Sequence, residues 1–165
     1  MDLAIRALRG DEWRLWRSLR LRAVEESPDS FRSTLGQESA EADEWWRDLI
    51  RATAEHPRGL LLVAEADSDP VGMLFGRLDD EAEVLEIGAM WVDPEVRRHG
   101  AGTGLVEAAF AWARGAGAAR AELWVTKGNE AAERLYENAG FVSTGETDML
   151  REDSEVEVIR LSVLI

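Results

Sequence analysis

The sequence of 165 residues contains no cysteine, and this absence excludes several kinds of chemistry. Without a thiol the chain forms no disulfide, binds no metal through thiolates and has no cysteine nucleophile. The histidines are His56 and His99, too few for a histidine-rich metal site, and we expect no bound metal. The lack of cysteine is also compatible with a reducing compartment.

Long apolar runs and positive charge are scarce as well. No stretch approaches the ~20 apolar residues that a membrane-spanning helix requires. The first residues, MDLAIRALRGDEW, lack the apolar centre of a signal peptide, so we expect a cytoplasmic protein with no membrane partner. The net charge is −14, because 33 acidic residues outnumber 19 Lys and Arg. Such a chain repels nucleic acid, which we do not expect as a partner.

What remains is the composition of an ordinary globular chain. Apolar residues make up 45% of the sequence and charged residues 32%, values typical of a protein that folds around a sizeable core. No repeat, linker or low-complexity segment interrupts it. We therefore expect one domain over residues 1–165.

Hydrophobic periodicity predicts strands and helices in a definite order. Strands are expected at 3–8, 59–66, 71–78, 82–92 and 119–126, with two more at 141–150 and 155–165. Helices are expected at about 11–26, 39–55, 100–116 and 129–140, and residues 31–38 are interpreted as a loop. The order βααβββαβαββ predicts an α/β protein (an α+β mixed sheet) with helices on both faces.

The segment WVDPEVRRHGAGTGL combines a strand end, a basic turn and the start of an alanine-rich helix. Arg97 and Arg98 precede three closely spaced glycines, Gly100, Gly102 and Gly104. Glycines let the backbone approach a ligand, and a helix start carries partial positive charge, so the pattern favours a phosphate. The loop lacks the lysine of a Walker loop, and its third glycine comes one residue too early for a dinucleotide fingerprint. The alternative is a glycine-rich helix start with solvated arginines.

A second motif, N-x-x-A-x-x-L-Y-x-x-x-G-F, runs from Asn129 to Phe141. Together with V-D-P-x-x-R-R-x-G-x-G it resembles the GNAT family of N-acetyltransferases. The resemblance is strongest over residues 83–141 and extends to the rest of the chain through the order of elements. It implies a GNAT-like acyl-CoA N-acyltransferase fold. It also implies acetyl-CoA (coenzyme A after transfer) as co-substrate and direct transfer of the acetyl group to an amine in a ternary complex.

The resemblance also implies where the co-substrate lies. The strand end at Met90, Trp91 and Val92 would pair with the pantetheine arm, and one N–H there would polarise the thioester carbonyl. Asn129 would contact the same arm or cap its helix. The pyrophosphate would be held by backbone N–H groups and arginine charge. The residues of that turn are Arg97, Arg98, His99, Gly100, Ala101, Gly102, Thr103 and Gly104. Arg98 stands where the family often has glycine, so the arginine that contacts phosphate stays open.

Two residues are candidates for catalysis, each with a structural alternative. Tyr136, the only tyrosine, matches the family position that protonates the departing thiolate. A phenol is protonated and able to donate at neutral pH; its alternative role is packing within the helix. Glu86 lies four residues before Met90 and interrupts an apolar run, which suits a general base. Glu83, bound water and an ordinary surface role are the competing interpretations.

The sequence does not name the acceptor. Acidic residues gather at 79–86 and again at 146–155, and a field of that sign attracts cations, so we expect a small cationic amine. Solubility alone is the alternative explanation. A protein N-terminus or lysine as acceptor and a non-catalytic acyl-CoA sensor or scaffold also stay open, as do monomer and homodimer.

Overall fold

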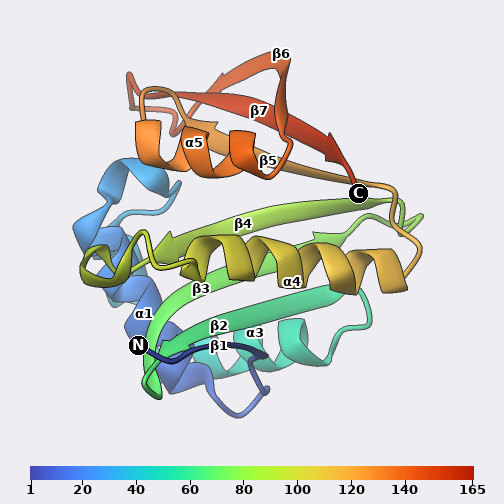
Figure 1. The fold of residues 1–165 in the computed structure, drawn as a ribbon. Helices are drawn as coiled ribbons and strands as arrows, with labels where there is room; N and C mark the ends of the chain where they lie inside the picture. The colour runs from blue at the N-terminus through green and yellow to red at the C-terminus, as the bar shows by residue number, and fades with distance from the viewer.

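A seven-stranded mixed sheet forms the middle layer of the protein in the computed structural model, which describes residues 1–165 (Figure 1). The strand order is β1-β2-β3-β4-β5-β7-β6, and only β4 and β5 run parallel. The strands are β1 (Leu3–Ala7), β2 (Gly59–Ala66), β3 (Asp69–Leu78), β4 (Val84–Val92), β5 (Arg120–Thr126), β6 (Val142–Met149) and β7 (Glu157–Leu164). The predicted mixed sheet is confirmed.

Helices cover both faces of this sheet, as predicted (Figure 1). The α-helices are α1 (Trp13–Glu26), α2 (Leu35–Ser39), α3 (Asp43–Glu55), α4 (Ala101–Gly115) and α5 (Glu130–Asn138). Helices α1 and α3 pack on one face, whereas α4 and α5 lie on the other. Two short 3-10 turns, η1 (Pro28–Ser30) and η2 (Pro94–Val96), follow α1 and β4. No helix is long and apolar enough to cross a membrane.

The prediction was wrong between residues 31 and 42, where an additional short helix forms. A capping box starts α2: Gln37 N donates to Thr34 Oγ1 at 3.2 Å, and Thr34 N donates to Gln37 Oε1 at 2.9 Å. Helix α3 begins at Asp43 rather than at residue 39. A helix of five residues shows too little periodicity to be recognised by its apolar pattern.

Each face of the sheet carries its own apolar core. Side chains alternate along β2, so Leu62 faces α4 while Val63 faces α1 and α3. Burying one such side chain stabilises the fold by about 1.5–3 kcal/mol. Trp16 and Trp46 are buried in the core beneath α1 and α3, as the helical spacing predicts, but the neighbouring Trp45 is 41% exposed.

Strands β4 and β5 are paired over only part of their length. Their parallel ladder starts at Val84 and ends where Ile87 lies opposite Leu123. Beyond Ile87 the edge of β4 has no strand partner on the β5 side. The sheet therefore opens at the carboxyl end of β4.

A bulge in β4 accompanies this opening. Gly88 lies opposite Phe75, and two residues, Ala89 and Met90, then occupy the space opposite a single residue of β3. Ala89 adopts a φ of +50°. A bulge bends its strand and increases the local twist, which turns β4 away from β5. The bulge thus directly follows Gly88.

Candidate active site

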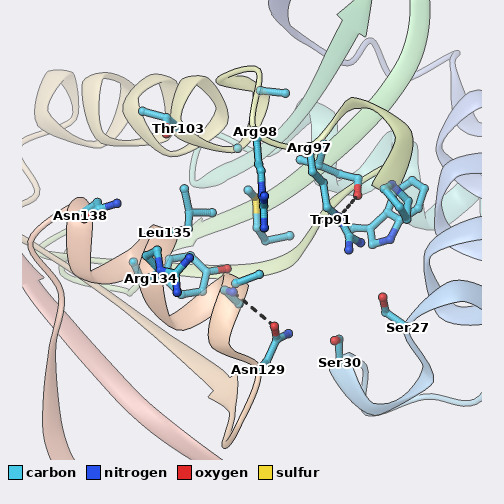
Figure 2. Close-up of a pocket in the computed structure, with 18 of the residues that line it drawn as sticks. Ser27, Ser30, Trp91, Arg97, Arg98, Thr103, Asn129, Arg134, Leu135 and Asn138 are labelled. Atoms are coloured by element: carbon cyan, nitrogen blue, oxygen red, sulfur yellow. Dashed lines mark hydrogen bonds between the residues drawn. The ribbon is translucent and has the colours of Figure 1, made fainter.

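A cleft of about 920 Å³ lies where β4 and β5 separate, between α4 and α5 (Figure 2). It brings together most of the predicted co-substrate residues. Those that line it are Met90, Trp91, Val92, Arg97, Arg98, Gly100, Ala101, Gly102, Thr103, Asn129 and Tyr136. His99, Gly104 and Glu86 do not line it. Sequence reasoning missed other lining residues, chiefly Ser27 and Ser30 after α1, and Arg134 and Leu135 on α5.

Two left-handed residues shape the turn between β4 and α4. Arg98 has a φ of +69° and Gly100 a φ of +90°. A side chain in this region costs roughly 1–2 kcal/mol, which explains why the family often has glycine where this chain has Arg98. Gly100 caps α4, and Gly104 N donates to Gly100 O at 2.9 Å as the first bond of the helix.

The start of α4 therefore presents free N–H groups to the cleft. Those of Ala101, Gly102 and Thr103 precede the helical ladder, and all three residues line the cleft. Such a row of donors at a helix start is an anion-binding arrangement. The N–H of Gly104 is used inside the helix, so it has no donor left for the phosphate contact predicted for it.

Gly102 and Gly104 are required for different reasons. A Cβ on Gly102 would lie 3.1 Å from Leu135 Cδ2 and 3.4 Å from Met90 Cε, so the missing side chain keeps the cleft open. A Cβ on Gly104 would instead lie 3.1 Å from Ile5 Cγ1. The second glycine lets α4 pack closely on β1.

The two arginines of the turn have different partners. Arg97 Nε donates to Val92 O at 2.9 Å, and its Nη2 donates to Glu26 Oε2 at 3.0 Å. Arg98 forms no ion pair and is exposed. Arg134, from α5, is the other unpaired cation of the cleft, and Figure 2 shows the two side chains on facing walls. Unpaired guanidinium groups on opposite walls favour an anionic ligand.

Glu26 fastens the end of α1 to the turn. It accepts hydrogen bonds from Trp91 Nε1 at 2.9 Å, from Arg97 and from Ser27. Burial raises the pKa of Glu26, but these hydrogen bonds and the charge of Arg97 outweigh burial and lower it. The sequence offered no signal for this contact, because 65 positions separate Glu26 from Trp91.

Tyr136 is both packed and placed in the cleft. It is only 6% exposed, and its ring lies edge-on against Phe141 with centroids 5.6 Å apart. Burial raises the pKa of its phenol, so the group stays protonated well above neutral pH. Its hydroxyl forms no hydrogen bond with the protein. The catalytic role predicted for Tyr136 stays a prediction that this geometry permits.

The position of Asn129 is compatible with both roles considered for it, as a helix cap and as a contact for the co-substrate. Its Oδ1 accepts from Ala132 N at 3.3 Å and caps α5, while the residue lines the cleft (Figure 2). The amide nitrogen of the side chain remains available for a ligand.

Glu86 lies on β4, outside the cleft, in an ion pair. Its two oxygens accept from Arg160 Nη1 at 2.6 Å and from Nη2 at 2.7 Å. Arg160 also donates to Glu122 and lies over the ring of Trp124, 5.2 Å from its centroid. The hydrogen bonds to Glu86 raise the pKa of Arg160. The pairing occupies both oxygens that a general base would use, so the base role of Glu86 stays a prediction without support from this geometry.

Comparison with known proteins decides the family. The model of the acetyltransferase (GNAT) family matches residues 19–141. The chain belongs to this family. The family resemblance expected from the two motifs is confirmed. The acceptor is left open.

Individual relatives agree with this assignment. The mycothiol acetyltransferase of Thermobispora bispora is 32% identical over 137 residues, which are 80% of this chain and 43% of that protein. This chain spans less than half the length of the curated relatives it matches.

Two solved structures share the fold across nearly the whole chain. A GNAT acetyltransferase from Streptococcus pneumoniae aligns with a TM-score of 0.81 at 22% identity, covering 99% of this chain and 100% of that one. The spermidine N-acetyltransferase of Vibrio cholerae, solved with CoA and spermine, aligns at 0.80 and 19% identity, covering 98% and 95%. At these identities the likeness concerns the fold alone.

Proposed function

We propose that the chain transfers the acetyl group of acetyl-CoA to the amine of a small cationic acceptor, by direct attack within a ternary complex. One observation carries the proposal. In a single cleft, the unpaired edge of β4 meets the free N–H groups of α4 and the hydroxyl-bearing side chain of Tyr136.

The walls of the cleft suit a long ligand with phosphates at one end. The N–H groups that start α4, with the unpaired charges of Arg98 and Arg134, would hold the phosphates. The edge of β4 near Met90 would pair with an extended amide-containing arm as an added strand does. Arg97 is already bonded to Val92 O and Glu26, so we assign the phosphate contact to Arg98.

Catalysis then needs orientation and one proton donor from the chain. The acceptor nitrogen forms the new C–N bond, the thioester C–S bond breaks, and the departing sulfur takes the proton of the Tyr136 hydroxyl. The proton released by the amine returns through water to the phenolate. Holding two substrates side by side supplies much of the rate, so no protein nucleophile is required.

Charge near the cleft supports a cationic acceptor. The acidic loop between β6 and β7 is held against the loop after α1, because Arg151 donates to Pro28 O at 2.7 Å, to Arg32 O at 3.0 Å and to Phe31 O at 3.2 Å. The loop after α1 lines the cleft through Ser27 and Ser30. Carboxylates placed beside a site raise the local concentration of cations.

The other acidic group does not contribute to this field. Residues 79–83 precede β4 and lie at the strand end away from the bulge. Asp79 Oδ1 accepts a hydrogen bond from Glu83 N at 2.7 Å, and Asp80 Oδ1 forms an ion pair with Arg58 Nη2 at 3.4 Å. Support for a cationic acceptor therefore comes from the side of β6 and β7.

An amine-panel screen tests the proposal. The protein is incubated with acetyl-CoA and with cationic, neutral and acidic amines or a peptide with a free N-terminus, and thiol release and product mass are measured. Acetylation of small cationic amines is expected. Binding of coenzyme A without thiol release from any amine would favour a sensor or scaffold, and selective acetylation of the peptide would favour a protein acetyltransferase.

A further inference from the structure

A second cavity, of about 320 Å³, lies on the other face of the sheet, under α1, α2 and α3. Its walls are mostly aromatic and aliphatic, and the tryptophans Trp16, Trp45 and Trp46 are among them. Glu38 of α2 is the only carboxylate that lines it. The catalytic scheme above uses none of these residues.

The carboxylate of Glu38 is incompletely bonded. The residue is only 6% exposed, and its Oε1 accepts from Arg20 Nε at 2.7 Å. Its Oε2 is buried and has no partner, and the indole Nε1 of Trp46 is likewise buried without one. Buried polar groups in folded proteins are nearly always hydrogen-bonded, so these two atoms indicate that something polar belongs in the cavity.

The cavity adjoins the co-substrate cleft along two stretches of chain. In the bulge of β4, Ala89 lines the second cavity while the next residue, Met90, lines the cleft. In the loop after α1, Ser27 and Ser30 line the cleft while Ser33 lines the cavity. The bulge of β4 and the loop after α1 therefore border both hollows, and the bulge is the point at which the β4 edge becomes free.

We propose that this cavity binds the distal ammonium group of the acceptor, and that the acceptor is an alkyl diamine or a longer polyamine. The inference rests on the proposed function and deepens it. A free carboxylate oxygen and aromatic rings are the two partners that bind an ammonium group most strongly in proteins. Glu38 supplies the first partner through Oε2, while Arg20, which also lines the cavity, holds its Oε1. Trp16, Trp45 and Phe75 supply the second partner.

The position of Glu38 explains why a second nitrogen is needed. Glu38 is on a helix, whereas Ala89 is on the sheet beneath it, so the two residues form different walls of the cavity. The nitrogen that attacks the thioester must lie at the bulge. An alkyl chain along the apolar walls would join it to a second nitrogen beside Glu38.

Direct binding tests the inference without any turnover. Three of the seven tryptophans line the cavity, so their fluorescence reports its occupation. We would titrate the full chain with 1,4-diaminobutane and 1,8-diaminooctane, using 1-aminobutane and 4-aminobutanoate as comparators. The better diamine should bind at least ~10-fold more tightly than the monoamine.

Variants assign the effect to the cavity. Glu38→Gln keeps the shape and should remove the preference for diamines while leaving coenzyme A affinity unchanged. Glu44→Gln makes the same charge change on an exposed residue outside the cavity and should behave as the wild type. Trp45→Leu alters a partly exposed wall residue and should weaken diamine binding about threefold, even if Glu38→Gln does not fold.

The possible outcomes separate the two proposals. Glu38-dependent diamine binding without acetylation would support this cavity site and contradict the proposed function. Acetylation of amines with no dependence on Glu38 or Trp45 would overturn the cavity site and leave the proposed function intact. Equal affinity for diamine and monoamine would mean that the cavity holds only water.

Discussion

The cleft and the cavity lie on opposite faces of β4, and they present different kinds of chemical group to a ligand. On the α4 side, the cleft presents main-chain groups from one short stretch, the strand end and the turn after it. On the α1 side, the cavity presents side chains from three helices and three strands that are far apart in the sequence. Main-chain recognition depends on backbone shape and tolerates many side chains. Side-chain recognition changes with every substitution, so the first face suits a shared co-substrate and the second a particular acceptor.

Gly102→Asp should weaken coenzyme A binding in the cleft on the α4 face and leave ligand binding in the cavity unchanged. The new side chain would collide with Leu135 and place a negative charge at the start of α4, where we expect phosphate. Coenzyme A affinity should fall by about 100-fold, equivalent to roughly 2.7 kcal/mol, as measured by calorimetry. Diamine titration through tryptophan fluorescence should be unchanged.

The matched control is Gly115→Asp at the other end of α4, where a Cβ meets nothing within 4 Å. It should leave coenzyme A affinity at the wild-type value. A folded Gly102→Asp variant that binds coenzyme A normally would contradict the assignment of the turn to phosphate.

Tyr136→Phe tests the chemical step between the two faces. The change removes only the hydroxyl, which has no hydrogen bond in the protein, so the melting temperature should stay constant. Turnover should fall about 10-fold, less than the ~100-fold or more that is typical for losing a general acid, because a thiolate is already a good leaving group. Michaelis constants for both substrates should change little.

The pH dependence of turnover provides a second measurement of the role of Tyr136. Since burial raises the pKa of Tyr136, the wild type should show no alkaline loss of turnover from this group near pH 9. Wild-type turnover in Tyr136→Phe would instead leave Tyr136 as a packing residue against Phe141.

The turn after β4 also allows its two arginines to be compared. Arg98→Ala removes an unpaired charge and keeps the Cβ at this left-handed position, whereas Arg97→Ala breaks the bonds to Val92 O and Glu26. We expect Arg98→Ala to weaken coenzyme A about fivefold in low salt, with less effect in high salt. Arg97→Ala should chiefly lower the melting temperature. The reverse pattern would assign the phosphate contact to Arg97.

The α4 face could be predicted from sequence because its information is local. The strand end, the turn and α4 lie within residues 84–115, and the glycines report backbone geometry directly. The role of each arginine could not be predicted, because the position of Glu26 decides it and Glu26 arrives from α1. The same holds for Glu86, whose partner Arg160 is 74 positions away.

The cavity on the α1 face of the sheet could not be predicted from the sequence. The helical spacing of Trp16 and Trp46 places both on the side of their helices that faces the core, and both are buried. Periodicity predicts which side of a helix faces the core, but it does not predict whether the packed side chains leave a cavity there. The cavity exists because α2, the helix missed between residues 31 and 42, places Glu38 over the sheet.

Glu86→Gln should have the smallest effect and decides whether the charges on this face of the sheet take part in the reaction. A general base at this position would make turnover fall by ~100-fold or more and would remove the acidic limb of the pH profile. The ion pair with Arg160 predicts otherwise: turnover within about twofold of the wild type and an unchanged pH profile. The stability cost should stay below ~1 kcal/mol, because solvent screens a pair in which Glu86 is 43% exposed. Glu122→Gln is the matched control, since it removes the other carboxylate that Arg160 binds. If both variants react like the wild type, the proton of the amine leaves through water, and the acceptor is selected by Glu38 rather than activated by Glu86.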